Sequence, residues 1–130
     1  MLIRLIYRSK VSRQVRLSDA EEIAEKAKPR NAAEDISGLL LYTSTHFIQV
    51  LEGEEAVVRK LFSRIKRDKR HLEVEVVADR PIERREFGGW SMHIAMPRKE
   101  TSAEALAALD EAAAQSLLLD AVSEHEAAKE

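Results

Sequence analysis

Apolar side chains in residues 47–53 follow the two-residue alternation of a β-strand. Alternation places Gln49 on one face with Phe47 and Leu51, and the opposite face is apolar, so we expect a strand in the middle of a sheet. The Gln49 carboxamide needs hydrogen-bond partners there, because an unpaired buried amide costs about 1–3 kcal/mol. Either a neighbouring backbone group or a bound ligand would supply them.

Four further segments carry strand patterns: residues 2–8, 36–43, 72–77 and 90–96. Tyr7 ends the first on an apolar face, either as a structural tyrosine with a bonded hydroxyl or as a redox tyrosine with a partner close by. Gly38 lies inside the second and indicates a bulge or a close approach of two backbones. In the last, Trp90 and Met92 share one face, which is typical of core residues.

Two helices are expected between these strands. Ser18 and Glu21 form a capping box that begins the first helix, and Pro29 ends it. The second helix spans residues 54–67, where acidic residues in the first turn and basic residues in the last match the helix dipole. Its buried stripe consists of Val57, Val58, Leu61, Phe62 and Ile65. Asn31 falls in the loop after the first helix, where it either caps the turn or offers an amide to a ligand.

The resulting order, β-α-β-β-α-β-β, predicts an α+β fold: a ferredoxin-like antiparallel or mixed sheet with two helices on one face. The other face needs cover, which we expect residues 101–130 to supply as a C-terminal helical extension. That tail is rich in Ala and Leu, contains no Gly or Pro, and opens with Ser102 as N-cap. Its apolar residues form two stripes, which fit two short helices or one helix contacting two surfaces. A partner subunit would offer the second surface, so we expect a homo-oligomer.

Composition and charge narrow the function. A chain of 130 residues forms one domain, and its net charge of -2 argues against nucleic-acid binding through bulk charge. No apolar run is long enough to span a bilayer and no signal peptide is present, so we expect a cytoplasmic protein without a membrane partner. Cysteine is absent, which excludes disulfides, thiolate metal sites and cysteinyl cofactor adducts. The four histidines lack metal-ligand spacing, so no metal site is predicted.

Six motifs occur in one order along the chain and together resemble the BLUF family of blue-light sensors that use flavin; they are residues 5–9, Asn31, 36–40, 47–53, 67–71 and 87–92. The resemblance covers residues 2–96, and it is the ordered set of motifs that makes it specific. It implies a flavin held noncovalently between the two helices, usually FAD, with FMN and riboflavin as alternatives. An apolar groove with a few placed amides suits such a planar ring.

The resemblance also implies roles for individual residues. Tyr7 matches the photoactive tyrosine of the family, and Gln49 matches the glutamine that bridges this tyrosine to flavin N5 and the C4 carbonyl. Asn31 matches the asparagine that bonds the pyrimidine edge of the flavin. Trp90 and Met92 match the photoactive tryptophan and methionine of the last strand, whose positions are linked to signalling, and Met92 is also expected to contact the flavin.

The charged turn after the second helix, residues 67–71, fits either a solvated helix end or an anion contact when its composition alone is considered. The resemblance places Arg70 and His71 beside the flavin and Asp68 close to its ribityl chain. Arg30 lies at a position that the family varies, and we include it among the expected cofactor contacts.

The function implied by the resemblance is that of a short, stand-alone blue-light photoreceptor, and not of an enzyme. Light would drive electron and proton transfer from Tyr7 via Gln49 to the flavin. The rearranged hydrogen bonds would signal through the last strand and the tail to an unidentified partner protein. Residues 1–97 would form the sensor domain and residues 98–130 a helical interaction segment.

Two other functions stay open from the residues alone. One is an enzyme on the same scaffold, a flavin reductase or a small hydrolase, although no nicotinamide site is evident and Ser91 and His93 lack an orienting acid. The other is a flavin-free interaction module that contacts its partner through the tail. A purified protein that is colourless and takes up no added flavin would favour the module.

Overall fold

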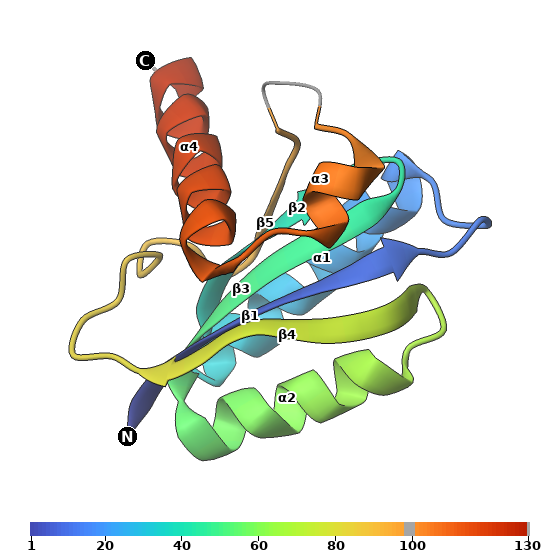
Figure 1. The fold of residues 1–130 in the computed structure, drawn as a ribbon. Helices are drawn as coiled ribbons and strands as arrows, with labels where there is room; N and C mark the ends of the chain where they lie inside the picture. The colour runs from blue at the N-terminus through green and yellow to red at the C-terminus, as the bar shows by residue number, and fades with distance from the viewer. Residues whose placement is uncertain (98–100, 130) are drawn as a thin grey trace.

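Five strands form one sheet in the computed structural model, which describes residues 1–97 and 101–129. They are β1 (Leu2–Val11), β2 (Ser37–Tyr42), β3 (His46–Glu54), β4 (His71–Pro81) and β5 (His93–Ala95). Their spatial order is β4-β1-β3-β2-β5, with β5 parallel to β2 and the other neighbours antiparallel. The central strand of this mixed sheet is therefore β3, as its apolar faces predicted (Figure 1). Both β1 and β4 run further than the alternation predicted.

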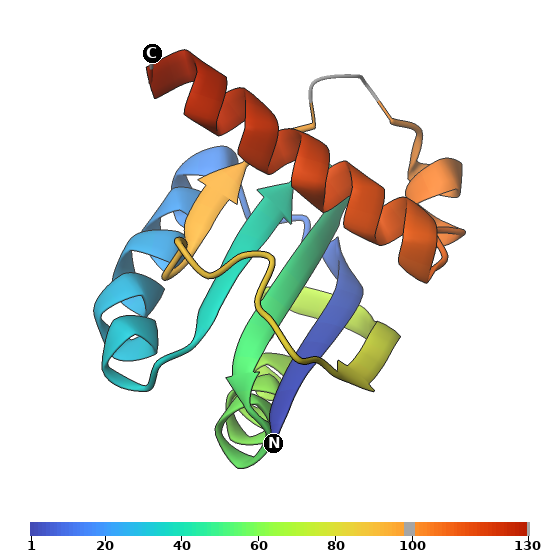
Figure 2. The same ribbon diagram turned by 90° about the vertical axis from the view of Figure 1, so that its left-hand side faces the viewer.

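Helices cover both faces of the sheet. On one face lie α1 (Leu17–Ala33) and α2 (Glu55–Arg67), and on the other lie α3 (Ala103–Ala107) and α4 (Glu111–Lys129) (Figures 1 and 2). The predicted α+β ferredoxin-like arrangement is confirmed, and so is the cover of the second face by the tail. The tail forms two helices, which decides between the two arrangements that its stripes allowed.

Two hydrophobic cores lie on the two sides of the sheet. The first core packs α1 and α2 against one face, and its buried residues include Ile3, Leu5, Tyr7, Phe47, Leu51, Leu61 and Phe62. The second core packs the tail against the other face, and its buried residues include Ile6, Leu39, Leu41, Ile48, Val50, Phe87, Leu106 and Leu118. Successive side chains of β3 thus enter opposite cores, which is why the strand reads as apolar throughout.

The first helix differs from its prediction at both ends. It begins with Arg16 as N-cap, so the predicted N-cap Ser18 is wrong, and Pro29 lies inside the helix instead of ending it. An interior proline removes one backbone hydrogen bond, but Ala24 and Ala27 are buried in the first core and the Glu34 N–H donates to the Arg30 carbonyl oxygen at 3.0 Å, so the last turn stays helical. Asn31 therefore lies on a helix and not in a loop.

The last strand is shorter than predicted, because residues 82–92, here called the connecting segment, are irregular and β5 begins at His93. Trp90 and Met92 do not share a face: Met92 lies in the first core and Trp90 in the second. A φ of 151° at Met92 interrupts the extended conformation that alternation between the two would require.

The start of the tail agrees with the sequence. The backbone N–H of Ala105 donates to Ser102 Oγ at 3.1 Å, which confirms Ser102 as the N-cap of α3. Leu106 and Leu118 are fully buried in the second core. The expected boundary between residues 97 and 98 falls at residues 98–100, which lie outside the described residues.

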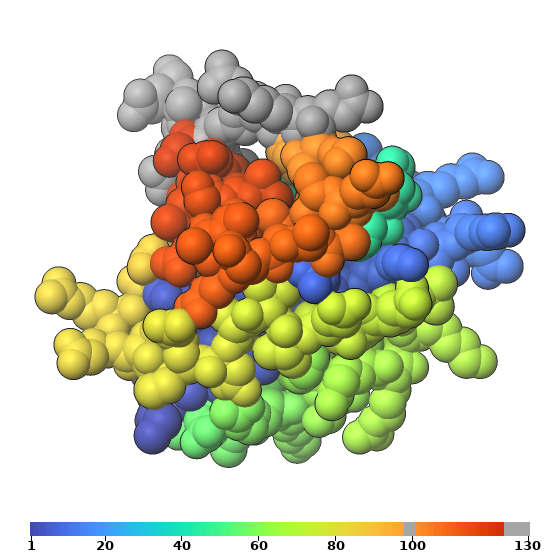
Figure 3. All heavy atoms as spheres, viewed as in Figure 1, coloured from blue at the N-terminus to red at the C-terminus, as the bar shows by residue number. Residues whose placement is uncertain are grey.

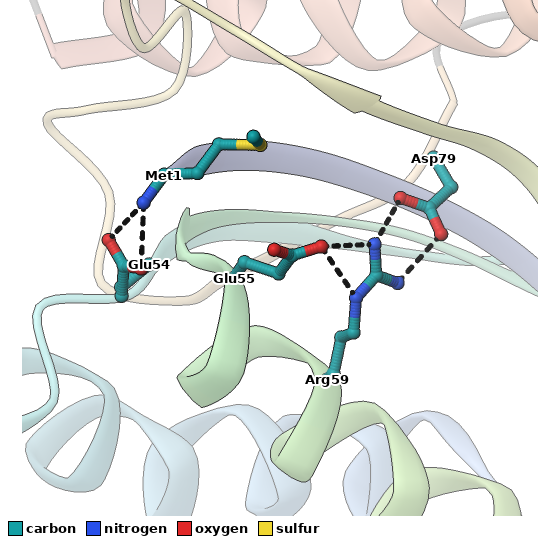
Figure 4. A network of polar contacts seen from close by, with 5 residues as sticks. All are labelled: Met1, Glu54, Glu55, Arg59 and Asp79. Carbon is teal, nitrogen blue, oxygen red and sulfur yellow. Dashed lines mark hydrogen bonds and ion pairs between the residues drawn. The ribbon is translucent and has the colours of Figure 1, made fainter.

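Ion pairs tie α2 to the edge of the sheet (Figure 4). Arg59 bonds Asp79 of β4 at 2.8 Å and Glu55 of its own helix at 2.9 Å. The N-terminal amino group of Met1 pairs with Glu54 at 2.8 Å. These groups are exposed, so the pairs contribute little stability and mainly fix the orientation of α2. The edge strand β4 stays at the surface between α2 and the tail helices (Figure 3).

Candidate functional site

A cavity of about 220 Å³ lies between α1, α2 and the first face of the sheet. Its walls come from α1, α2, the turn after α2 and the sheet, and its lining residues are Ile23, Lys26, Ala27, Arg30, Asn31, Leu40, Gln49, Leu61, Arg64, Ile65, Asp68, Arg70, His71 and Met92. All the predicted cofactor contacts except Tyr7 are among them. Tyr7 is linked to the cavity through Gln49.

A chain of three buried side chains runs to the floor of this cavity. The Tyr7 hydroxyl donates to Gln49 Oε1, and Gln49 Nε2 donates to Met92 Sδ at 3.1 Å. Antiparallel pairing of β1 with β3 sets Tyr7 opposite Gln49. The two contacts favour one orientation of the amide, because exchanging its oxygen and nitrogen would set the amide oxygen against the acceptor Met92 Sδ and leave the Tyr7 proton without its acceptor.

The Tyr7 phenol is held in its protonated form. Burial raises its pKa well above the usual range of a tyrosine, and the negative charge of Asp68 raises it further. The ring packs against Phe62 at 5.4 Å and His71 at 5.9 Å between centroids. Tyr7 is therefore a fixed hydrogen-bond donor to Gln49 at neutral pH.

His71 closes one end of the cavity as a neutral imidazole. Burial lowers its pKa to about 4, and the charge of Asp68, which acts in the opposite direction, is the smaller effect. Its Nδ1 lies 2.9 Å from Ser9 Oγ, so a serine hydroxyl satisfies one ring nitrogen. The neutral ring adds no charge beside Tyr7.

Asn31 carries the clearest requirement for a ligand. The residue is fully buried and lines the cavity, and neither its Oδ1 nor its Nδ2 has a hydrogen-bond partner in the described part of the protein. Each unpaired atom costs about 1–3 kcal/mol, so a ligand with a neighbouring donor and acceptor would be bound strongly here. The pyrimidine edge of a flavin, with its N–H between two carbonyls, meets that requirement.

Charged groups gather near the same cavity. Arg70 Nε donates to Asp68 Oδ1 at 2.9 Å, and this pairing lowers the pKa of the Asp68 carboxyl and raises that of the Arg70 guanidinium. Arg30 and Arg64 also line the cavity, and neither makes an ion pair with any described residue. Unneutralised guanidinium groups suit the phosphates of a nucleotide cofactor.

Trp90 is the predicted site residue that the structure does not bring to the cavity. Its side chain is buried in the second core, on the far face of the sheet, with its ring 4.6 Å from that of His93. Trp90 is linked to Met92 along the connecting segment, and its carbonyl oxygen also accepts a hydrogen bond from the Gly38 N–H of β2 at 2.7 Å.

Sequence reasoning missed several lining residues, among them Lys26 and Arg64. The signal was available, because Ile23, Lys26 and Arg30 recur at helical spacing on α1. The prediction that Pro29 ends the helix hid this spacing, because it placed Arg30 outside the helix that carries Ile23 and Lys26. Within residues 1–97 and 101–129, the structure shows no cluster of three or more metal-ligating side chains and no helix long and apolar enough to cross a membrane.

Comparison with known proteins gives one consistent result. Residues 2–93 match the family model described as BLUF, sensors of blue-light using FAD. The chain is 38% identical over 95 residues to the blue light- and temperature-regulated antirepressor BluF of Escherichia coli (strain K12), which covers 72% of this chain and 23% of that protein. It is 39% identical over 87 residues to photoactivated adenylate cyclase subunit alpha of Euglena gracilis, or 67% of this chain and 8% of that protein.

Solved structures resemble the whole fold. BlrB, described as a BLUF protein in its dark state, has a TM-score of 0.80 and 31% identity over 95% of this chain and 96% of its own. The photo-activated state of BlsA has a TM-score of 0.81 and 28% identity over 93% of this chain and 94% of its own. The chain thus spans nearly all of these two structures, but less than a quarter of the antirepressor and under a tenth of the cyclase subunit.

Proposed function

This chain belongs to the BLUF family of blue-light sensors that use flavin, and from that premise we propose that it holds FAD in the cavity between α1 and α2, with Tyr7 and Gln49 carrying the light reaction. As a member of a sensor family it is not an enzyme, as the sequence predicted. The observation that carries the proposal is the pair of buried amides on the cavity wall: Asn31 needs a partner, and Gln49 is held by one.

Different residues of the cavity would contact different parts of the flavin. Asn31 would bond the pyrimidine edge, and Gln49 would face the reactive centre of the ring. The apolar walls, with Ile23 and Leu61 on opposite helices, would exclude water from the ring. FAD is favoured over riboflavin because Arg30 and Arg64 offer charge that a diphosphate would neutralise. His71, Asp68, Arg70 and Met92 would complete the contacts.

A bound flavin supplies the absorption of blue light and an excited state that accepts an electron and a proton. The protein supplies the donor, because Tyr7 is an oxidisable phenol already bonded to Gln49 Oε1. Its Oη proton has one acceptor in the described structure, so Gln49 is the relay. Once that proton moves, the amide loses the contact that fixed its orientation, and its bond to Met92 Sδ is released.

Signal output would follow from Met92. Release of Gln49 Nε2 from Met92 removes one of the contacts that hold the end of the connecting segment, which leads into β5 and carries Trp90 against the tail. We propose that residues 1–97 sense light, that residues 98–130 contact a downstream protein, and that the chain is a cytoplasmic homo-oligomer. The names of the relatives, an antirepressor and a cyclase subunit, support signalling to an effector without identifying this chain's partner.

Absorption spectra before and after blue light test the proposal. The purified chain should show a flavin spectrum that shifts slightly to the red and relaxes in darkness, and flavin released by denaturation should migrate with FAD and not with FMN. A flavin spectrum that does not respond would refute the photoreceptor. A colourless protein that takes up no added flavin would instead support an interaction module.

The Gln49→Leu variant tests the assigned residue. It should bind flavin but lose the reversible red shift, because leucine provides neither the acceptor for Tyr7 nor the donor for Met92. Ser44→Ala, in the exposed turn before β3, is a matched control that should respond as the unmodified chain does. A normal photocycle in Gln49→Leu would refute this role.

A further inference from the structure

A buried polar row crosses one end of the second face of the sheet. Arg4 of β1, Glu52 of β3 and Ser37 of β2 lie opposite one another in register. All three are buried, and Glu52 has no exposed surface at all. A buried carboxylate needs several partners, since charged groups lose their hydration in a protein interior. The hydrogen-bond donors to Glu52 therefore indicate which part of the chain this polar row holds in place.

Glu52 receives three hydrogen bonds. Arg4 Nε donates to Oε2 at 2.8 Å, the backbone N–H of Phe87 donates to Oε1 at 2.7 Å, and the backbone N–H of Glu86 donates to Oε2 at 3.1 Å. Two of the three donors thus belong to the connecting segment. Bonds from amides to a carboxylate are among the stronger hydrogen bonds in proteins. Glu52 of the sheet therefore holds the connecting segment through the segment's backbone N–H groups.

Neighbouring contacts hold the same place. Arg85 Nη1 donates to Ser37 Oγ at 2.9 Å, and Arg85 Nη2 donates to the carbonyl oxygen of Asp35 at 2.7 Å. The Phe87 ring is fully buried in the second core. Residues 85–87 are therefore fixed to β2 and β3, and the free length of chain before β5 is short.

The short stretch between Phe87 and β5 contains Met92, which contacts Gln49 of the Tyr7–Gln49 pair. Beyond Phe87, the Trp90 carbonyl accepts from the Gly38 N–H at 2.7 Å, and Met92 then meets the Gln49 amide at 3.1 Å. Met92 keeps a φ of 151°, a value that costs free energy and persists only where the surrounding structure imposes it. Fixing the chain at residues 85–87 is one way to impose it.

We infer that Glu52 is a positioning residue for the light reaction: its carboxylate, on the face of β3 opposite Gln49, anchors the connecting segment so that Met92 Sδ stays against the Gln49 amide. This role rests on the proposed function. It also reaches the tail, because Gln115 of α4 donates to Glu86 Oε1 at 3.0 Å. The anchored residue that donates its N–H to Glu52 thus contacts α4 with its side chain.

The Glu52→Gln variant of the full chain tests the role. Glutamine has one acceptor oxygen where glutamate has two, so one of the two backbone amides loses its partner and the segment is held less tightly. In the proposed reaction the Gln49 amide and Met92 Sδ separate in the light and meet again in darkness, and a segment that is held less tightly should lower the barrier to that movement. We expect flavin to bind as before and the lit state to recover about tenfold faster.

Glu54→Gln is the matched control, because Glu54 lies on the same strand but is exposed and pairs with the N-terminus. It should recover within about twofold of the unmodified rate. A lower unfolding midpoint in Glu52→Gln with an unchanged recovery rate would show a merely structural role and overturn the inference. An unmodified chain that binds flavin but shows no light response would overturn the proposed function, and this role with it.

A second pair of variants asks the same question if Glu52→Gln does not fold. Glu86 is exposed, and Glu86→Pro removes its N–H while leaving Glu52 and Arg4 in place. Glu86→Ala keeps that N–H and removes the side-chain contacts to Gln115 and Arg4. Faster recovery in Glu86→Pro than in Glu86→Ala supports the anchor, and equal rates overturn it.

Discussion

Replacing Asn31 by leucine should have opposite effects on the flavin-free and the flavin-bound protein. Both polar atoms of Asn31 are buried without a partner among the described residues, and each costs about 1–3 kcal/mol. Leucine has a similar size and no polar atom, and the adjoining cavity of about 220 Å³ accommodates the difference. Because leucine removes both atoms, the free energy of unfolding of the flavin-free protein should rise by about 2–6 kcal/mol.

Flavin affinity should fall in the same variant. Leucine removes a donor and an acceptor to the ligand, and a loss of about 1.4 kcal/mol weakens binding tenfold, so two such bonds correspond to about 10–100-fold. Urea denaturation followed by circular dichroism measures the first quantity, and quenching of flavin fluorescence on titration measures the second.

Gln49→Leu provides the contrast, because the Gln49 amide is already bonded within the protein. Its removal leaves the buried Tyr7 hydroxyl without an acceptor, so the flavin-free protein should lose about 1–3 kcal/mol. If Asn31→Leu destabilised the flavin-free protein as much as Gln49→Leu does, the Asn31 amide would have a partner inside the protein. The reasoning on the site would then fail.

Three further predictions concern the core and the cavity. Tyr7→Phe should keep flavin and lose the light response, because the ring still packs but the donor to Gln49 is gone; spectra before and after illumination check this. His71 has a pKa of about 4 when folded and an ordinary one near 6.5 when unfolded, so it contributes stability above pH 6.5 that is lost as the pH falls towards 4. Between pH 7 and pH 4.5 the unmodified chain should lose about 2 kcal/mol more than His71→Asn in urea denaturation, and parallel losses would contradict the assignment. Gly38→Ala would put a Cβ atom 2.0 Å from the Val50 carbonyl oxygen, so it should destabilise by at least about 3 kcal/mol, whereas Gly89→Ala meets no atom within 4 Å and should stay within about 0.5 kcal/mol; thermal unfolding that ranks them otherwise would refute the close approach.

The sequence was sufficient to locate the strands, because each of the five overlaps an apolar segment predicted as a strand, although β5 covers only His93–Ala95 of the last segment. Residues 47–53 were predicted as a central strand from their apolar faces, and β3 lies there with neighbours on both sides. Most of the site residues could be predicted from the sequence for another reason. Motifs from separate segments, such as those around Tyr7 and Gln49, occur in the order that is typical of one family. Those two residues are in contact.

Local rules failed where tertiary packing decided the outcome. Pro29 is a strong signal for the end of a helix, yet the helix continues past it, because Ala24 and Ala27 bury its face in the first core and the Glu34 N–H still bonds the Arg30 carbonyl oxygen. Trp90 and Met92 are two residues apart, and alternation predicted one face for both, but the φ of Met92 sends them to opposite cores. A pattern read along a strand carries no information about a backbone angle imposed by contacts elsewhere.

The parallel pairing of β5 with β2 has a consequence for the order of folding. Leu39 pairs with His93, and β1 pairs with β4 across a longer stretch still, as with Ile3 and Pro81. Both contacts form late, because closing a long loop costs entropy. Met92 reaches the cavity through the pairing of β5 with β2, next to Gln49. A nascent chain that has made only its first three strands and two helices therefore has the walls of the cavity without its complete floor. Ligand capture then belongs to a late stage of folding, and the free energy of binding stabilises a pairing that forms late.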